Sequence, residues 1–481
     1  MFAARWGGRA QVSVVESEEI GIVGVGEGST PQLKAFFDQL GIAEAEWMPK
    51  CNATYKVGIG FRGWSERPGY GFYFHPFPSQ LDVHTAPAFF ANSRARRQRH
   101  DVWAHPDRFF LPALLAAGRL GPHPGENFPF EIGYGYHFDA FLIGAFLREH
   151  AAGRGVRRLE RRIVDIGVDE TGTVTHLQAE GGERIEGDFF VDCSGFRSLM
   201  AQQALGVRFL PFAANLFNDA AVVMPTPPDP KAVESSTTAT ALGNGWAWRI
   251  PLRSRIGNGY VYSTRYCSPE QAEAELRAHL GVGEDIPARH LAMKVGRVEQ
   301  SWAGNCLAVG LSQGFIEPLE ATALHIVQAT VEGFIEAWEA GGHTPRHRDA
   351  FNRAIAARYE GIRDYIVCHY RVNRRTDTRY WRDNAAHDEL SDSLKSILTC
   401  WFTAGDLEQE IARQDIGRYY APISWHCLLA GYGNFPADKA MRPPGPGAPR
   451  HDMAAIDEFV RRCALNFEDH GRLLAQAGGA G

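Results

Sequence analysis

Residues Gln11–Glu16 have the sequence Gln-Val-Ser-Val-Val-Glu, a short β-branched run that ends in an acid. Such a run is typical of a buried parallel strand rather than of a strand with one solvated face. In a doubly wound sheet, an acid at the end of the second strand accepts hydrogen bonds from the ribose of a dinucleotide. The stretch therefore predicts an α/β fold with a nucleotide-binding sheet, in which Glu16 is either the ribose ligand or a solvated strand-end acid.

The ten residues before this strand carry half of an apolar helical pattern, closed by Gly7-Gly8. A dinucleotide glycine fingerprint should lie about 20 residues before Glu16, so we expect the first strand and its glycine loop to be missing from the chain. A literal GxGxxG occurs at residues 58–63, but it runs into Ser-Glu-Arg-Pro-Gly, which cannot open a helix. It is therefore not a phosphate loop.

Two later stretches repeat the design of an apolar strand that meets a glycine turn. They are Asp188–Gly195 (Asp-Phe-Phe-Val-Asp-Cys-Ser-Gly) and Asn305–Gly314 (Asn-Cys-Leu-Ala-Val-Gly-Leu-Ser-Gln-Gly). Each is suited to present backbone amides to a nucleotide. They predict that the nucleotide-binding sheet is completed late in the chain.

The remaining patterns predict a second sheet and a helical region. Aromatic and β-branched residues at 246–251 and 260–264 predict antiparallel strands. Helical spacing of apolar residues follows at His325–Ala340, His347–His369 and Leu390–Ala404. A proline- and glycine-rich linker at residues 443–449 precedes a last helix.

Composition restricts the class of protein. A chain of 481 residues exceeds one compact core, and its 44% hydrophobic and 22% charged residues are ordinary for a globular protein. The net charge of −6 is spread along the chain, which argues against nucleic-acid and membrane partners and favours small molecules. The eight cysteines form no CxxC pair, and no apolar run or signal peptide is present, so we expect a cytoplasmic protein without a metal site.

Three stretches together resemble the flavin-dependent tryptophan halogenase family, from about Val12 to Gly433. They are Gly24-Val-Gly-Glu-Gly-Ser-Thr-Pro31, the WxWxIP motif Trp246-Ala-Trp248-Arg-Ile-Pro251, and Phe315-Ile-Glu-Pro-Leu-Glu-Ala-Thr322. The resemblance implies a glutathione-reductase-like FAD-binding sheet, an antiparallel substrate sheet and a C-terminal helical region. It also implies FADH2 from a separate reductase, a halide ion, and hypohalous acid that halogenates an electron-rich, indole-type substrate.

The resemblance also assigns the cofactor site. The implied cofactor-binding residues are Glu16, Gly26, Glu27, Gly28, Ser29, Gly195, Gly310, Thr322 and Ala323. The halide is expected at the backbone amides of Thr322 and Ala323. Ala323 stands where the best-known members have glycine, which we expect to crowd the halide.

Glu320 matches the catalytic glutamate of the family, which accepts the ring proton or stabilises the cationic intermediate. Glu317 is the more structural acid of the pair. The family's catalytic lysine is expected at the position of Gly60, so the sequence predicts weak or absent halogenation. Lys56 lies on the same face of the strand but roughly 13 Å away at about 3.3 Å per residue, and is interpreted as a solvated strand lysine.

The substrate side combines matches and a departure. Phe74-His75-Pro-Phe77 resembles the pair that sandwiches an indole, His137 precedes a helix near the pocket, and His75 has the alternative interpretation of a surface histidine. Trp246 and Trp248 are expected to bar organic substrates from the flavin; the alternative is an aromatic core stripe. Tyr419-Tyr420 lacks the insert that follows it in the tryptophan enzymes, which predicts an indole or phenol without the amino-acid group, or a larger peptide.

These patterns divide the chain into a partial FAD-binding segment (1–50), a substrate and tunnel segment (51–155), an FAD-binding return (156–205), an antiparallel sheet (206–300), an FAD-binding closure (301–340), a helical pocket region (341–440), and a linker with a last helix (441–481). Three hypotheses follow: a halogenase, a monooxygenase or oxidase that has lost halogenation, and a non-catalytic remnant. A homodimer is compatible with each.

Overall fold

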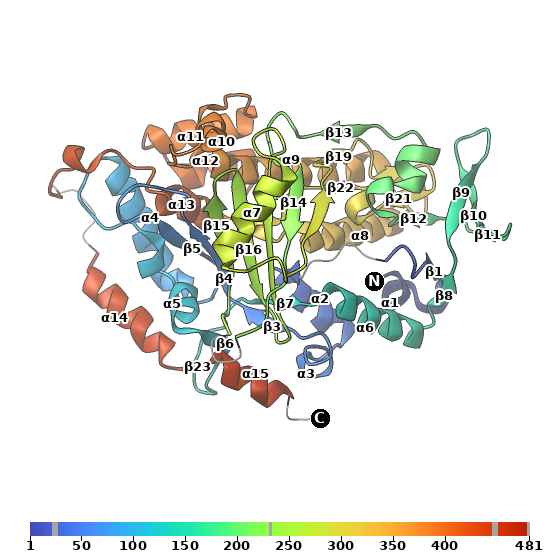
Figure 1. Ribbon diagram of the computed structural model, residues 1–481, viewed down its shortest axis with the longest axis horizontal. Helices are drawn as coiled ribbons and strands as arrows, with labels where there is room; N and C mark the ends of the chain where they lie inside the picture. The colour runs from blue at the N-terminus through green and yellow to red at the C-terminus, as the bar shows by residue number, and fades with distance from the viewer. Residues whose placement is uncertain (22–26, 230–232, 445–450, 479–481) are drawn as a thin grey trace.

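The computed structural model describes residues 1–21, 27–229, 233–444 and 451–478. A seven-stranded sheet crosses the middle of the molecule (Figure 1). Its strands, in spatial order, are β18 (Arg289–Ala292), β14 (Ala220–Val223), β17 (Ile256–Tyr262), β16 (Gly245–Pro251), β15 (Thr237–Leu242), β4 (Gly58–Arg62) and β5 (Phe72–Pro76). The pairing of β15 with β4 is parallel and the others are antiparallel. The predicted antiparallel sheet is thus confirmed.

The predicted nucleotide-binding strands are also present. β12 (Phe190–Asp192) pairs in parallel with β21 (Cys306–Ala308), which pairs with β20 (Trp302–Ala303). β1 (Ser13–Glu16) pairs in parallel with β8 (Arg157–Glu160) as a separate ribbon. Val14 on β1 is 44% exposed, so the predicted burial of this strand is wrong although its parallel pairing is confirmed.

The first residues form a helix that docks on a later one. α1 (Phe2–Trp6) lies against α8 (Ala323–Ala340), where the Trp6 indole and the Arg5 guanidinium both donate to the carboxylate of Glu339. The rings of Phe2 and Phe334 meet edge to face. The short apolar pattern at the start of the chain is therefore a packed helix.

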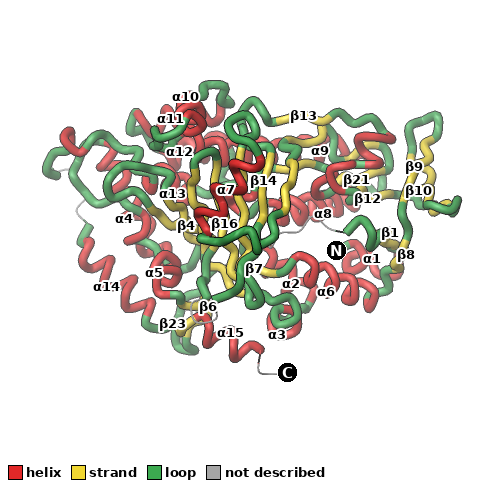
Figure 2. The backbone as a smooth tube through the Cα atoms, in the orientation of Figure 1, coloured by secondary structure: helices red, strands yellow, loops and turns green. Residues whose placement is uncertain are grey.

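Helices cover the sheet as the periodicity predicts. α8 and α9 (Arg348–Arg371) run behind the central sheet, and the next helices, α10 to α13, gather at one end of it (Figure 2). These are α10 (Arg379–Ala386), α11 (Asp392–Phe402), α12 (Leu407–Gln414) and α13 (Pro422–Gly431). The C-terminal segment forms α14 (Met453–Ala464), β23 (Phe467–Asp469) and α15 (His470–Gly478). The predicted α/β class with a helical C-terminal region is confirmed.

A small sheet carries residues of the site. Its order is β2 (Glu27–Gly28), β7 (Gly135–Phe138) and β3 (Thr54–Lys56). Other strands are β6 (Leu120–Pro124), β9 (Ile163–Val168), β10 (Val174–Ala179), β11 (Arg184–Glu186), β13 (Phe209–Pro211), β19 (Gly296–Val298) and β22 (Gly314–Phe315). Further helices are α2 (Gln32–Leu40), α3 (Glu44–Trp47), α4 (Asp82–Arg97), α5 (Leu111–Gly118), α6 (Ala140–Gly153) and α7 (Pro269–Leu280).

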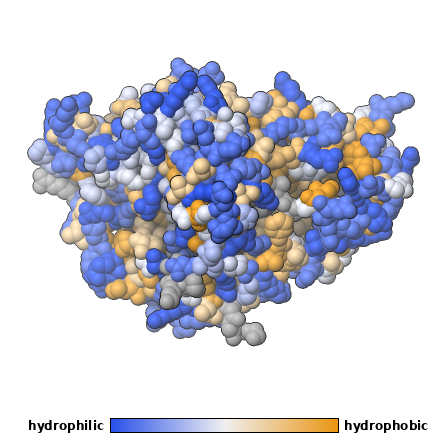
Figure 3. All heavy atoms as spheres, viewed as in Figure 1, coloured by the Kyte–Doolittle hydropathy of each residue, from blue (hydrophilic) through white to orange (hydrophobic). Residues whose placement is uncertain are grey.

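The main core lies between the central sheet and α8, α9 and α13, and is rich in aromatic side chains. Trp64, Trp246, Trp381 and Trp425 are among its fully buried members. Aromatic side chains bury large apolar areas and pack in fixed geometries, so they hold the walls of a site rigid. The surface is mostly hydrophilic, with an apolar patch over the end of β9 (Figure 3). No helix in the described part of the chain is long and apolar enough to cross a membrane.

Candidate active site

Glu320 is a buried carboxylate held by two imidazoles. It ends the 3-10 turn Pro318–Glu320, directly before α8. Its Oε2 lies 2.9 Å from Nδ1 of His75, and its Oε1 lies 3.0 Å from Nε2 of His369. Burial raises the pKa of Glu320, but the two histidines outweigh burial and hold it at about 2. Glu320 is therefore an anion at every physiological pH.

The outer nitrogens of the two histidines are held by one helix. Nε2 of His75 lies 2.9 Å from the Ser424 hydroxyl, and Nδ1 of His369 lies 2.8 Å from the Tyr432 hydroxyl. Ser424 lies in the first turn of α13 and Tyr432 directly follows its last residue. Burial lowers the pKa of His369, so this ring is neutral, donates to Glu320 through Nε2 and accepts from Tyr432 at Nδ1. α13 thus fixes the orientation of both rings that hold the carboxylate.

Lys56, on β3, is the second ionisable group of the site. Its side chain is fully buried, and its Nζ has no hydrogen-bond partner among the described residues. Nζ lies 5.3 Å from the centre of the Phe77 ring, and a Cβ at Gly28 would lie 3.2 Å from it. Burial lowers the pKa of Lys56 to about 7, against an opposing effect of the Glu320 charge. The amine therefore has unused donors and titrates near neutrality.

These facts correct the interpretation of residues 56 and 60. Lys56 is not a solvated strand lysine, because it is fully buried. Gly60 lies opposite Phe74 on β5, and a Cβ there would lie 2.8 Å from the ring of Phe72. A lysine at residue 60 would have to displace that ring, whereas the buried amine of Lys56 is already in place.

Glu317 anchors the first indole of the WxWxIP motif. Its Oε2 accepts hydrogen bonds from Trp246 Nε1 at 2.8 Å, from the Tyr370 hydroxyl at 2.6 Å and from Asn218 Nδ2 at 3.0 Å. Burial raises its pKa, and the three donors oppose that shift. The carboxylate faces donors of the protein itself, which fits the structural role expected of Glu317.

The second indole fits against bare backbone. The ring centres of Trp246 and Trp248 lie 6.1 Å apart. A Cβ at Gly259 on the neighbouring strand would lie 2.1 Å from the Trp248 indole, so only glycine leaves room for this ring. Both indoles are more than nine-tenths buried and form a fixed wall.

His137 links three strands beside Lys56. Thr54 donates to the carbonyl oxygen of Pro251 at 2.7 Å, so its oxygen accepts from Nδ1 of His137 at 3.0 Å. Nε2 then accepts from the Thr237 hydroxyl at 2.9 Å. Burial lowers the pKa of His137, as does the charge of Lys56. His137 is therefore neutral, fully hydrogen-bonded and held away from direct chemistry.

The start of α8 and two glycine turns offer unused backbone donors. No side chain caps the N-terminus of α8, and the buried Thr322 hydroxyl has no partner among the described residues. Ala323, the first helical residue, is exposed. Gly195 and Gly310 follow the carboxyl ends of β12 and β21, and both have φ of 69°. Free N–H groups at a helix start suit an anion, and glycine turns after parallel strands suit a dinucleotide, so these residues fit FAD and a halide.

The other predicted cofactor residues are distributed differently. Gly26 lies outside the described residues, and Glu27 and Gly28 pair with β7 through their backbones. The Ser29 hydroxyl accepts from the Tyr136 backbone at 2.9 Å, so it is engaged within the protein. The Glu16 carboxylate makes ion pairs with Arg148, at 2.9 Å, and Arg158.

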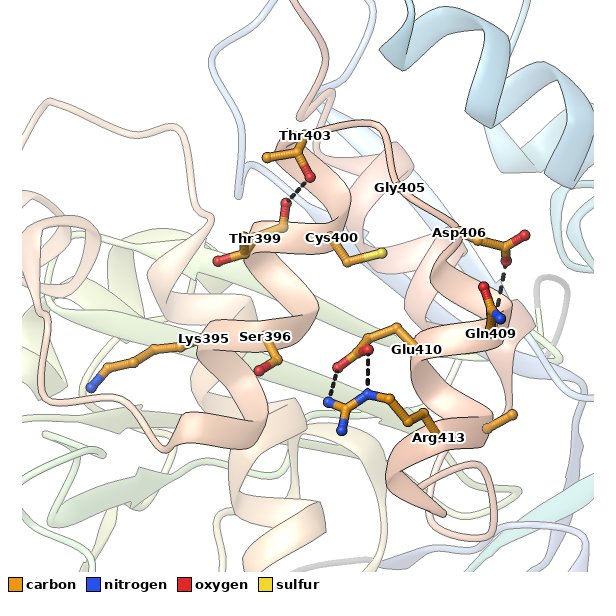
Figure 4. A pocket seen from close by; sticks show the side chains of 11 residues that line it. Lys395, Ser396, Thr399, Cys400, Thr403, Gly405, Asp406, Gln409, Glu410 and Arg413 are labelled. Carbon is orange, nitrogen blue, oxygen red and sulfur yellow. Dashed lines mark hydrogen bonds and ion pairs between the residues drawn. The ribbon is translucent and has the colours of Figure 1, made fainter.

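A surface groove lies between α11 and α12 (Figure 4). It has a volume of about 860 Å3, and its lining includes Lys395, Thr399, Cys400, Glu410 and Arg413. The Glu410 carboxylate is already paired with the Arg413 guanidinium. None of the residues that line it belongs to the Glu320 cluster, which consists of Glu320, His75, His369, Ser424 and Tyr432, so this groove is not the candidate active site.

Sequence reasoning missed the partners that shape the site. His369, Ser424 and Tyr432 carry no local motif, and His369 lies 49 residues from Glu320. Helical periodicity places His369 in the last turn of α9 but does not indicate what that turn faces. For Lys56 the available signal was its position in an otherwise buried strand segment.

Comparison with known proteins places this geometry in a family. The family model described as tryptophan halogenase matches residues 1–443. The 7-chloro-L-tryptophan 6-halogenase KtzR of Kutzneria sp. (strain 744) is 37% identical over 98% of this chain and 96% of its own length. The tryptophan 7-halogenase RebH of Lentzea aerocolonigenes is 33% identical over 89% of this chain and 85% of its own length.

Solved structures agree with the sequence matches. The crystal structure of the tryptophan 6-halogenase SttH from Streptomyces toxytricini superposes with a TM-score of 0.83 at 34% identity, covering 98% of this chain and 96% of that one. BrvH, a flavin-dependent halogenase from Brevundimonas sp. BAL3, also gives 0.83, at 31% identity, over 99% and 95% of the two chains.

Proposed function

The chain belongs to the tryptophan halogenase family, and on this basis we propose that it halogenates the indole ring of a tryptophan-like substrate, with Lys56 and Glu320 as its catalytic pair. It is an FAD-dependent enzyme that uses FADH2 from a separate reductase together with a halide ion. When bound, the reduced flavin supplies, with oxygen and halide, the hypohalous acid that acts as the electrophile. The observation that carries the assignment is a buried amine, without a partner among the described residues, that is subject to the charge of a carboxylate that stays anionic.

Lys56 holds the hypohalous acid beside the substrate. Its Nζ donors have no partner among the described residues, so a small polar reactant can take them without breaking a bond of the protein. The Phe77 ring, 5.3 Å from Nζ at its centre, walls this position and excludes water. A donor in such a dry site acts far more strongly on a reacting oxygen than it does in water.

Glu320 receives the ring proton. As the carbon–halogen bond forms, the ring becomes cationic, and the anionic carboxylate stabilises that charge and then takes the proton from the substituted carbon. His75 and His369 keep the carboxylate charged until this step and fix both of its oxygens in place. Glu317, by contrast, is engaged by three donors of the protein and holds Trp246.

The cofactor and the halide are assigned to separate elements. Gly195 and Gly310 are proposed to approach FAD through their backbones, and the amides of Thr322 and Ala323 to hold the halide at the uncapped start of α8. His75 and Phe77 are proposed to line the substrate pocket. Trp246 and Trp248 form the wall that keeps the substrate from the flavin.

Turnover of an indole panel tests the proposal. The enzyme, a flavin reductase, FAD and bromide are incubated with free tryptophan, indole and a tryptophan-containing peptide, and brominated products are identified by mass spectrometry. We expect a monobrominated product from at least one substrate, and almost none with Glu320→Gln. FADH2 oxidation with release of peroxide and no brominated product from the wild type would contradict the proposal and favour an oxidase.

The setting of the enzyme is proposed from its chemistry. All eight cysteines are free thiols, which suits a reducing cytoplasm. The partners proposed are the aromatic substrate and the flavin reductase. Gel filtration tests whether the chain also forms a homodimer.

A further inference from the structure

Tyr420 is a buried phenol without a partner. Its ring stacks on that of Tyr365, with centres 3.6 Å apart and planes 10° from parallel. The residue is 8% exposed, and its hydroxyl has no hydrogen-bond partner among the described residues. A buried hydroxyl without a partner costs free energy, about 1–3 kcal/mol.

The stacked pair adjoins the Glu320 cluster. The ring centre of Tyr365 lies 6.1 Å from that of His75 and 5.3 Å from that of His369, the two residues that hold Glu320. The Tyr365 hydroxyl donates to the carbonyl oxygen of Ser424 at 3.0 Å. Burial raises the pKa of Tyr420, and the Glu320 charge raises it further. Tyr420 is therefore a neutral phenol, and the negative charge of Glu320 acts on it.

The two rings differ in access. Tyr365 is 0% exposed and its hydroxyl is engaged, whereas Tyr420 keeps some exposure and a free hydroxyl. A phenol is activated towards electrophilic halogenation at the carbons beside its hydroxyl, as an indole is at its own ring carbons. A stacked electron-rich ring and a nearby anion both stabilise positive charge in the attacked ring.

We propose that Tyr420 is a site of self-halogenation, modified by the enzyme's own hypohalous acid when no aromatic substrate fills the pocket. The inference rests on the proposed halogenase function. A carbon–halogen bond forms at the ring carbon beside the hydroxyl while the oxygen–halogen bond of the acid breaks. The ring carbon then loses its proton to the released hydroxide, and the two give water. The net change replaces one ring hydrogen by halogen.

The modification should inactivate the enzyme. A halogen atom enlarges a ring that is already stacked at 3.6 Å on Tyr365, and overpacking of this kind shifts neighbouring side chains. The hydroxyl of Tyr365 is hydrogen-bonded to the backbone of Ser424, and the Ser424 hydroxyl holds His75. A displacement of Tyr365 is therefore expected to displace Ser424 and, through it, His75. Turnover without substrate is therefore expected to reduce later activity progressively.

Peptide mass spectrometry tests the inference. The full chain is incubated with a flavin reductase, FAD, oxygen and bromide in the absence of aromatic substrate, and then digested. We expect the bromine isotope doublet on Tyr420, its disappearance in Tyr420→Phe, and its suppression by saturating indole. Tyr420→Phe should also survive idle turnover longer than the wild type.

Tyr419 is the matched control. It is the adjacent tyrosine, but its ring centre lies 5.7 Å from the Arg358 guanidinium and 5.0 Å from that of Arg418, away from the Glu320 cluster. Tyr419→Phe should leave both the label and the activity unchanged. Bromine spread equally over Tyr419 and other surface tyrosines would indicate freely diffusing oxidant and overturn the inference.

A parallel assay with indole separates this inference from the function beneath it. Bromoindole formed by a protein whose Tyr420 stays unmodified overturns self-halogenation and leaves the halogenase function intact. FADH2 oxidation without bromine on either the indole or the protein overturns both.

Discussion

The carboxylate side and the amine side of the site are built in opposite ways. Glu320 accepts from two imidazoles, and each imidazole is in turn held by a hydroxyl, from Ser424 in α13 or from Tyr432 directly after it. Lys56 is as deeply buried, but its amine has no hydrogen-bond partner among the described residues. The hydrogen bonds of Glu320 are therefore formed before any reactant arrives, whereas the donors of Lys56 are unused.

The difference fits the task proposed for each side. A carboxylate fixed by two imidazoles keeps its charge and position, which suits a group that must stabilise a cation without moving. A buried amine without a partner costs stability, and the cost is returned only when a reactant accepts from it. The comparison therefore predicts that changes at Lys56 alter activity and stability in opposite directions, whereas changes around Glu320 alter its pKa.

The largest effect is expected from Lys56→Met, which keeps the length of the side chain and removes the donor. Halogenation should fall by about 10²–10³-fold, the usual cost of losing a key donor in a dry site, while FADH2 oxidation continues. Product formation and flavin oxidation are measured in parallel. Lys395→Met, at a surface lysine, is the control. Full halogenation by Lys56→Met would mean that another residue holds the hypohalous acid.

Gly60→Lys, introduced into the Lys56→Met variant, tests whether a lysine at residue 60 can replace Lys56. Because a Cβ at residue 60 would lie 2.8 Å from the Phe72 ring, we expect no recovery of halogenation and a lower melting temperature. Recovery would restore residue 60 as the functional position.

The second effect is on stability. Burial lowers the pKa of Lys56 from 10.5 to about 7, so at intermediate pH the unfolded chain binds the proton more tightly than the folded one. The resulting destabilisation is fully present below pH 7 and fades as the pH rises towards 10.5. Lys56→Met should therefore be more stable than the wild type, by roughly 2–4 kcal/mol near pH 6, with a smaller gain at pH 9. Denaturant unfolding at the two pH values measures this; a gain independent of pH would rule out the titration.

The third effect tests whether His369 acts by donating a hydrogen bond to Glu320 or only by packing. His369→Phe removes one donor to Glu320, so the pKa of Glu320 rises, and the loss of activity at acidic pH moves to higher pH. A hydrogen bond to a charged group contributes about 1.5–3 kcal/mol, which equals about 1–2 pH units at 1.36 kcal/mol per unit, so the acid limb of kcat should move up by about that much and activity below it should fall. His369→Gln, whose amide can still donate, should retain most of it. A uniform loss in both variants, with no movement of the acid limb of kcat, would reduce His369 to a packing role.

Local patterns predicted the fold: the WxWxIP strand and the helices after residue 325 follow from short stretches of sequence. The separate roles of Glu317 and Glu320 were implied by the family resemblance and stay a prediction. The prediction for Lys56 was wrong because residues 56 and 60 were assumed to lie in one continuous strand, with side chains that alternate between its two faces. In the structure, β3 pairs with β7 in one sheet and β4 pairs with β5 and β15 in another, so spacing along the strand no longer determines what the side chain faces. The histidine at residue 369 was missed because helix α9 meets the Pro318–Glu320 turn only through the tertiary fold.

The smallest effect concerns Ala321, which joins the carboxylate side to the start of α8. Its φ of 55° is a left-handed conformation that alanine adopts at a cost, and it lies directly between Glu320 and Thr322. Ala321→Gly relieves that strain in the folded state but raises the conformational entropy of the unfolded chain, and the two effects oppose each other. The free energy of unfolding should therefore change by no more than about 0.5–1 kcal/mol, which corresponds to a few degrees in melting temperature. If the strained residue fixes the angle between the carboxylate and the amides proposed to bind the halide, kcat should fall several-fold with KM for the indole unchanged. Ala340→Gly, at the other end of α8, is the control; an equal loss of kcat in both variants would mean that the geometry at residue 321 has no special role.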